Sequence, residues 1–225
     1  MILRVIHGRG APGQLEAVAA ALGEIYAPAR PVESAIARLH LGQRRIPVEG
    51  ESGGGDVAAD HAFAHNATTR HKAADDIEIC VLSCWRSAEA ASAADARGTS
   101  PLAIARAELP DLSVEHFEID ETVLLDVDRP ARVLRIATGQ FSKLGADKEM
   151  LDVLRQRVPT IGAPMVEAHI GRRLVGREVR ITFVSSWSEA PSGQDLRDAF
   201  WTDIALRYES FDVRVYEAVP IAGFR

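Results

Sequence analysis

Short, strongly apolar runs recur along this 225-residue chain and alternate with segments that carry one apolar face. Two runs stand out because each ends in tryptophan: ICVLSCW at Ile79–Trp85 and ITFVSSW at Ile181–Trp187. Apolar residues occupy both alternating sets of positions in these runs, which is the pattern of a strand covered on each face. We therefore predict two buried strands at equivalent places in the fold.

Other stretches repeat in the same order along the chain. The pairs are Leu3–Arg9 with Leu134–Gln140, His40-Leu41-Gly42 with His169-Ile170-Gly171, and Val114–Glu118 with Val213–Glu217. This order predicts a tandem duplication. His40 precedes Trp85 by 45 residues but His169 precedes Trp187 by 18, so the first half carries an insertion of 27 residues.

The hydrophobic spacing predicts the same series of elements in both halves. The first half has expected strands at Ile2–Arg9, Ala35–Arg45, Ile79–Trp85 and Val114–Leu125, and helices at Pro12–Tyr26, Ala88–Ala96 and Pro101–Leu109. The second half has expected strands at Arg132–Phe141, Met165–Leu174, Glu178–Trp187 and Phe211–Val219, and helices at Asp147–Val158 and Ser192–Tyr208. Each half therefore reads β-α-β-β-α-β, the ferredoxin-like order.

These elements predict an α+β fold in which two ferredoxin-like repeats pack sheet to sheet as a pseudo-dimeric α/β barrel. A single repeat covers one sheet face with helices and leaves the other bare, so packing two repeats together buries both bare faces. The expected boundaries are 1–127 and 128–225, with the insertion at about 46–76 in the first repeat.

Composition and charge narrow the class of protein. The formal net charge is −6 and no dense Lys/Arg cluster occurs, which argues against nucleic-acid binding. No apolar run reaches the roughly 18–20 residues of a membrane span, and MILRVIHGRG lacks the apolar core of a signal peptide. Cys80 and Cys84 would lie about 13 Å apart on one strand, too far for a disulfide. We therefore expect a cytoplasmic protein with reduced cysteines.

The tryptophan-tipped strands carry a family resemblance. Val81–Ala90 (VLSCWRSAEA) and Phe183–Ser192 (FVSSWSEAPS) each continue from the tryptophan into an acidic and small-residue helix start. Together with the element order, this resembles the antibiotic-biosynthesis-monooxygenase branch of the dimeric α/β-barrel superfamily, with two copies fused in one chain. The resemblance covers nearly the whole chain except Ile46–Asp76. Members of that superfamily include cofactor-free quinone-forming monooxygenases, haem-degrading monooxygenases, small isomerases and proteins without known activity.

The resemblance implies a pocket lined by a polar residue of the first strand and the tryptophan of the third. In the first half these are His7 and Trp85, the expected catalytic residues, and in the second half Thr138 and Trp187, expected to bind substrate. A histidine with an ordinary pKa near 6.5 suits proton abstraction at neutral pH. The alternative is that the histidine and both indoles are core residues.

Two further groups of histidines have two interpretations each. His40 and His169 either bind a carboxylate or phenolate of the substrate or hold the scaffold. His61, His65 and His71 of the insertion either bind a metal or lie in a solvated loop, and we expect no metal and no cofactor. Haem-degrading relatives place a histidine on the helix after the third strand, and neither Ser87–Leu109 nor Ser192–Tyr208 contains one.

The sequence thus favours a cofactor-independent monooxygenase acting on a small aromatic or polyketide-like substrate. One alternative is a non-catalytic small-ligand-binding or stress-response α/β-barrel protein, and another is a metal- or haem-binding protein with its site in the insertion. Because the second repeat takes the place of a partner subunit, we expect a monomer that mimics a dimer, with higher assembly left open. The expected partner is a small apolar or aromatic ligand, with neither nucleic acid nor membrane.

Overall fold

The computed structural model describes residues 1–26, 35–45, 76–126, 128–141, 146–161, 164–176, 178–189 and 208–222. In the first half the strands are β1 (Ile2–Gly10), β2 (Ile36–Arg45), β3 (Ile77–Trp85) and β4 (Asp111–Leu124), and the helices are α1 (Pro12–Ile25), α3 (Ala88–Ala96) and α4 (Pro101–Glu108). All seven predicted elements of this half are present, with ends that shift by up to three residues.

In the second half the strands are β5 (Val133–Phe141), β6 (Met165–Val175), β7 (Glu178–Trp187) and β8 (Ser210–Val219). Helix α5 (Ala146–Arg157) is followed by the short 3₁₀ helix η2 (Val158–Thr160). The predicted helix Ser192–Tyr208, except for its last residue Tyr208, and the insertion 46–76, except for Asp76 at its end, lie outside the described residues. The fold is α+β, with eight antiparallel strands and four α-helices in the described part of the chain.

The eight strands form one closed barrel in the order β1-β3-β2-β8-β5-β7-β6-β4, and every neighbouring pair is antiparallel. The first half contributes the run β4-β1-β3-β2 and the second the run β8-β5-β7-β6. The two runs join edge to edge, where β2 pairs with β8 and β4 pairs with β6. Closure pairs the edge strands of the two runs with each other, which limits the exposed sheet edge at which aggregation can begin.

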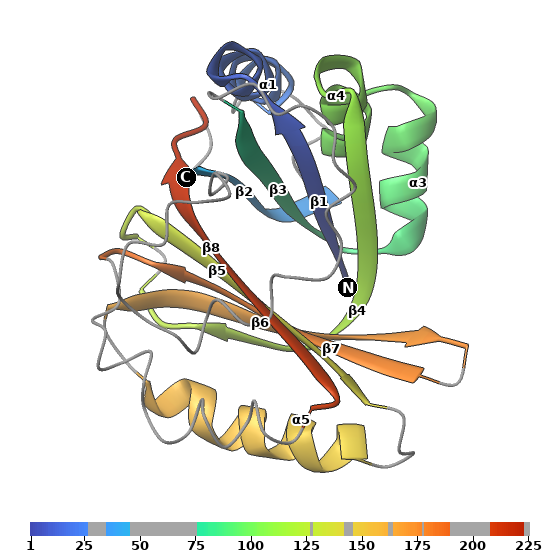
Figure 1. Cartoon of the computed structure of the whole chain (residues 1–225), viewed down its shortest axis with the longest axis vertical. Coiled ribbons are helices and arrows are strands. Elements are labelled where there is room, and N and C mark those ends of the chain that lie inside the picture. Colours follow the sequence, from blue (N-terminus) through green and yellow to red (C-terminus); the bar gives the residue numbers. More distant parts are fainter. Residues whose placement is uncertain are drawn as a thin grey trace, which may run out of the picture.

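The barrel wall is buried on both faces, which explains the continuous apolar runs. An inner cluster fills the barrel and includes Leu3, Val5, Leu82, Phe117, Leu134, Ile136 and Val184. On the outer face, α1, α3 and α4 cover the first half, and α5 covers the second half at the opposite side of the molecule (Figure 1). Successive side chains of a strand point to opposite faces, so each strand supplies both the inner core and a helix-side core.

The glycines of the repeated His-Leu-Gly and His-Ile-Gly motifs lie at the two joins between the halves. A Cβ at Gly42 would lie 2.8 Å from the Cβ of Tyr216, and one at Gly171 would lie 2.9 Å from the Cβ of Phe117. Such contacts are too close for any side chain, so an inward-facing aromatic on β8 or β4 requires glycine on the neighbouring strand. The structure therefore explains the two repeated glycines by the close approach of neighbouring strands.

Candidate active site

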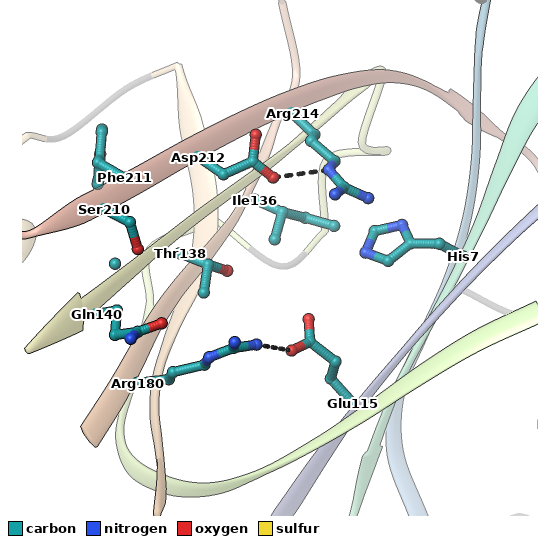
Figure 2. Close-up of a pocket in the computed structure, with 11 residues that line it drawn as sticks. His7, Glu115, Ile136, Thr138, Gln140, Arg180, Ser210, Phe211, Asp212 and Arg214 are labelled. Carbon is teal, nitrogen blue, oxygen red and sulfur yellow. Dashed lines mark hydrogen bonds and ion pairs between the residues drawn. The ribbon is translucent and has the colours of Figure 1, made fainter. Parts of the chain in front are cut away.

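A pocket of about 260 Å³ lies at one end of the barrel, where β1 and β5 end and β3, β4, β7 and β8 begin. We call this end the barrel mouth. The pocket is lined by His7, Glu115, Ile136, Thr138, Gly139, Gln140, Arg180, Ser210, Phe211, Asp212 and Arg214. Most of these residues are polar or charged, whereas the ligand that we expected from the sequence is apolar or aromatic. Figure 2 shows the imidazole of His7 pointing toward the pocket, with two ion pairs beside it.

His7 reaches the pocket because of strand alternation. It follows Leu3 and Val5 on the inner face of β1, and it pairs with Cys80 of β3, which belongs to the inner cluster. The side chain is buried, with 9% of the residue exposed. The base proposed from the sequence therefore lies inside the barrel and lines a pocket.

A hydrogen-bonded chain fixes the imidazole of His7. Tyr216 Oη lies 2.9 Å from His7 Nδ1 and donates to Glu78 Oε1 over 2.6 Å. A carboxylate only accepts, so the phenol must give its proton to Glu78 and accept one from Nδ1–H. This assigns the proton of neutral His7 to Nδ1. The lone pair of Nε2 is then left for a ligand.

Burial and charge keep the three groups in these protonation states. Burial, reinforced by the nearby Arg214 guanidinium, lowers the pKa of His7 to about 4. Burial opposes the ionised form of Glu78, but the Tyr216 hydrogen bond and Arg44 outweigh it and hold its pKa below the ordinary value. Burial and Glu78 raise the pKa of Tyr216 well above its usual range. At neutral pH the chain is therefore carboxylate, phenol and neutral imidazole.

Two ion-pair clusters flank the pocket. In the first, Arg44 Nη2 lies 2.6 Å from Glu78 Oε2 and Arg214 Nη1 lies 3.3 Å from Glu78 Oε1. The Nε of Arg214 also lies 2.7 Å from Asp212 Oδ2. In the second, across the pocket, Glu115 Oε1 lies 3.1 Å from Arg180 Nη1 and 3.6 Å from Arg173 Nη1. We call these the Glu78 cluster and the Glu115 cluster.

The strand registers show that the two clusters occupy equivalent positions with the charges exchanged. Glu78 pairs with Arg9, two residues after His7, and Arg180 pairs with Gln140, two residues after Thr138. Glu115 is opposite Val5, and Arg214 is opposite Ile136, the equivalent of Val5. The first half therefore supplies both glutamates, one from its third strand and one from its fourth, and the second half supplies the arginines that face them.

The residues at the positions of His7 and Tyr216 also differ between the halves. Thr138 is the equivalent of His7, and its hydroxyl lies 3.2 Å from that of Thr182. Phe117 is the equivalent of Tyr216, because they pair with Leu3 and Leu134 respectively. Only the first half thus contributes a candidate base, and the second half contributes the phenol that orients it.

His40 and His169 lie inside the barrel but away from this pocket, toward its other end. His40 Nε2 forms a short contact with Glu167 Oε1, and Arg38 Nε donates to Glu167 Oε2 at 2.6 Å. β2 and β6 are opposite one another in the barrel, so these contacts cross its interior. His169 bonds Thr122 through Nδ1 at 3.1 Å. We call these residues the cross-barrel cluster; none of them lines the pocket at the mouth.

The carboxylate of Glu167 is the ionised centre of the cross-barrel cluster. Its own burial opposes ionisation, but the hydrogen bond and charge of His40 outweigh it and lower the pKa of Glu167 to about 2. Burial lowers the pKa of His169 to about 4, so this imidazole is neutral at pH 7. The contacts of Glu167 join β2 to β6 across the barrel interior, which indicates a structural role for the cross-barrel cluster.

Both candidate tryptophans lie on the outer face of the barrel wall. Trp85 packs in the helix-side core of the first half, and Trp187 packs against α5 in that of the second. Their Nε1 atoms donate to Ser83 Oγ at 3.0 Å and Ser185 Oγ at 2.9 Å. The structure therefore brings His7 and Thr138 together in one pocket, and it separates both from Trp85 and Trp187 by the thickness of the sheet.

Sequence reasoning missed Tyr216, Glu78, Arg180 and Arg214. A signal for Tyr216 and Arg214 was present in the repeats Val114–Glu118 and Val213–Glu217, where Glu115 aligns with Arg214 and Phe117 with Tyr216. A charge exchanged between otherwise similar strands marks a position where the two halves differ.

Among the described residues, no group of three or more His, Cys, Asp or Glu side chains is placed to hold a metal ion. His61, His65 and His71 lie outside them. Cys80 and Cys84 are buried free thiols, as predicted, and burial raises the pKa of each. Every helix within the described ranges is too short or too polar to serve as a membrane span.

Comparison with known proteins identifies the fold. No protein-family model matches the chain, and no curated protein matches it. A crystal structure of a "putative monooxygenase" from Fusobacterium nucleatum subsp. nucleatum has a TM-score of 0.62 at 11% identity, over 98% of this chain and 93% of the other. A "putative monooxygenase" from Lactobacillus acidophilus gives 0.58 at 10% identity, over 98% and 95%.

A crystal structure of an "anthrone oxidase-like protein" gives a TM-score of 0.51 at 10% identity, over 97% of this chain and 91% of that one. At such identities the likeness establishes the fold alone. The chain therefore has the fold of structures described as monooxygenases, in agreement with the resemblance seen in its strands.

Proposed function

We propose that this protein is a cofactor-independent monooxygenase that oxidises a small hydroxylated aromatic compound in the pocket at the barrel mouth. The observation that supports it is the chain from Glu78 through Tyr216 to His7, which keeps a neutral imidazole beside a pocket. The fold shared with structures described as monooxygenases also supports it. A pocket of about 260 Å³ lies just below the usual range of roughly 300–1,000 Å³, so one or two fused rings suit it best.

In this proposal the protein supplies a base and a shielded site, and the substrate supplies the electrons. His7 Nε2 takes a proton from an acidic C–H or O–H of the substrate. The resulting anion reacts with O₂ and forms a carbon–oxygen bond, and the peroxide so formed takes the proton back from His7. Loss of water then leaves a quinone, so that one oxygen atom enters the product and the other leaves as water. The four electrons that reduce O₂ come from the substrate.

The charges at the mouth favour this proton transfer. The guanidiniums of Arg180 and Arg214 both line the pocket, where they would stabilise the anion as it forms. That anion would in turn attract the proton held by the imidazolium, which offsets the low pKa of His7 in the empty pocket. Base and anion would thus stabilise each other in a site with little water.

Oxygen uptake tests the proposal directly. Purified protein, treated with chelator, is expected to accelerate O₂ consumption by anthrone or by one- and two-ring hydroquinones. One O₂ should be consumed per quinone formed, with one oxygen atom incorporated into the product and no H₂O₂ released. The measurement combines an oxygen electrode with the visible absorbance of the quinone. Uptake equal to the uncatalysed rate across the panel, with binding detected by calorimetry, would instead support a non-catalytic binding protein. A metal or haem site in residues 46–76 would appear in elemental analysis and in the visible spectrum of the protein as purified, before chelator is added.

We also propose that the two halves arose by duplication and replace the two subunits of a dimer. The common order of strands in β4-β1-β3-β2 and β8-β5-β7-β6 supports this, as do the paired glycines Gly42 and Gly171. A barrel that is already closed needs no second chain. Sedimentation equilibrium is therefore expected to give a mass near 24.4 kDa; a concentration-independent mass of twice that value would contradict it.

A further inference from the structure

The two walls of the pocket differ in charge. In the Glu78 cluster two arginines, Arg44 and Arg214, face two acids, Glu78 and Asp212. In the Glu115 cluster two arginines, Arg173 and Arg180, share a single carboxylate. Among the described residues that line the pocket or pair with its lining, the excess positive charge therefore lies on the wall of Glu115.

Arg180 is the residue of that wall best placed to meet a ligand. It lines the pocket, its side chain is 36% exposed, and its ion pair with Glu115 uses only Nη1. Figure 2 shows the pair Arg180–Glu115 on one side of the pocket and His7 with the pair Arg214–Asp212 on the other. A guanidinium has five N–H donors in a planar fork, so one ion pair leaves others for a second carboxylate.

We infer that Arg180 recognises a carboxylate, and that the ligand of this pocket is a one- or two-ring hydroxylated aromatic acid rather than a neutral aromatic compound. The acid group binds at the Glu115 cluster and directs the hydroxylated part of the ring toward His7. The inference rests on the proposed function for the hydroxylated ring, while the acid group follows from the charge of the wall.

The pocket lining agrees with such a ligand. Gln140, Thr138 and Ser210 supply neutral donors and acceptors along the floor between the two walls, and Ile136 and Phe211 supply apolar surface for a ring. A neutral polycyclic compound would cover these polar side chains with apolar surface, which costs binding energy wherever a polar group then lacks a partner. An aromatic acid would meet the polar side chains with its polar groups and the apolar surface with its ring.

Anaerobic calorimetry with 2,5-dihydroxybenzoate and its neutral amide tests the inference without any turnover. The wild-type protein is expected to bind the acid at least tenfold more tightly than the amide, and the preference should weaken with added salt. Arg180→Gln is expected to reduce affinity for the acid at least tenfold and to change affinity for the amide less than twofold. Arg180→Lys, which keeps the charge, should retain part of the preference.

Arg155→Gln, a partly exposed arginine on α5, is the matched control and should leave both affinities unchanged. Circular dichroism confirms that each variant is folded. Equal affinity for acid and amide in the wild-type protein, or an undiminished preference in folded Arg180→Gln, would overturn the inference. Tight binding of the acid without any O₂ uptake would leave it standing and would refute the monooxygenase proposal alone.

Discussion

His7→Ala is expected to lower kcat for O₂-dependent oxidation at least a hundredfold, with the overall fold retained. General bases typically contribute factors of roughly 10² to 10⁴ to a rate. In this site no other neutral imidazole among the described residues lines the pocket. The initial rate of O₂ uptake at saturating substrate measures the effect. His116→Ala removes a histidine from the outer face of β4, where it accepts from Arg4, and provides a matched control with an expected change below twofold.

The pH profile separates a base from a merely structural histidine. With a pKa of about 4, His7 is already neutral at pH 7, so kcat/KM is expected to stay level from about pH 8 to pH 5 and to fall below that.

Tyr216→Phe removes the acceptor of the Nδ1–H of His7 and should cost about ten- to a hundredfold in kcat. Phenylalanine is the equivalent residue of the other half, Phe117, so the change fits this strand. An unchanged rate in His7→Ala would remove His7 from the mechanism.

Acidification from pH 7 to pH 4.5 is expected to remove about 5 kcal/mol of stability, a large part of the 5–15 kcal/mol typical of a folded domain. His7 and His169 have a folded-state pKa of about 4, against 6.5 for an unfolded histidine. Between these values the unfolded chain binds more protons, so stability falls as the pH falls. Each histidine accounts for about 2.5 kcal/mol at pH 4.5 by this linkage.

Glu167 acts in the same direction at lower pH. Its folded-state pKa of about 2 lies below the ordinary 4.5, so the stability it provides is present above about pH 4.5 and is lost as the pH falls toward 2. The effects of the histidines and of this carboxylate therefore follow one another and do not cancel.

Urea unfolding followed by circular dichroism at pH 7, 6, 5 and 4.5 measures this dependence. His169→Gln keeps a polar partner for Thr122 but cannot take up a proton, so it is expected to lose about 2.5 kcal/mol less than the wild type over this range. Arg155→Gln should show the full wild-type dependence. A free energy of unfolding that is constant from pH 7 to pH 4.5 would show that the buried histidines are not held neutral by the fold.

The order of elements could be predicted because apolar spacing and turn residues are local signals. The end of β3 at Trp85 and the turn at Gly176, which has a positive φ of 65°, needed only neighbouring residues. The inner face of β1 was also predictable, since His7 follows Leu3 and Val5 at intervals of two residues.

The face occupied by each tryptophan was not predictable from its strand. β3 is apolar on both faces, so alternation alone could not show that Cys80 and Cys84 point into the barrel while Trp85 points toward the helices. That choice depends on the pairing of β3 with β1 and β2 and on closure of the barrel. The partners of His7 were equally hidden, because Tyr216 is 209 residues away in the sequence.

The exchange of charges between the two clusters determines which halves can assemble with each other. Two copies of the first half, closed into the same barrel, would set Glu78 of each against Glu115 of the other. Two copies of the second would crowd Arg173 and Arg180 of one against Arg214 of the other. Opposed like charges at an interface cost several kcal/mol. Separately expressed halves are therefore expected to pair with each other and not with copies of themselves.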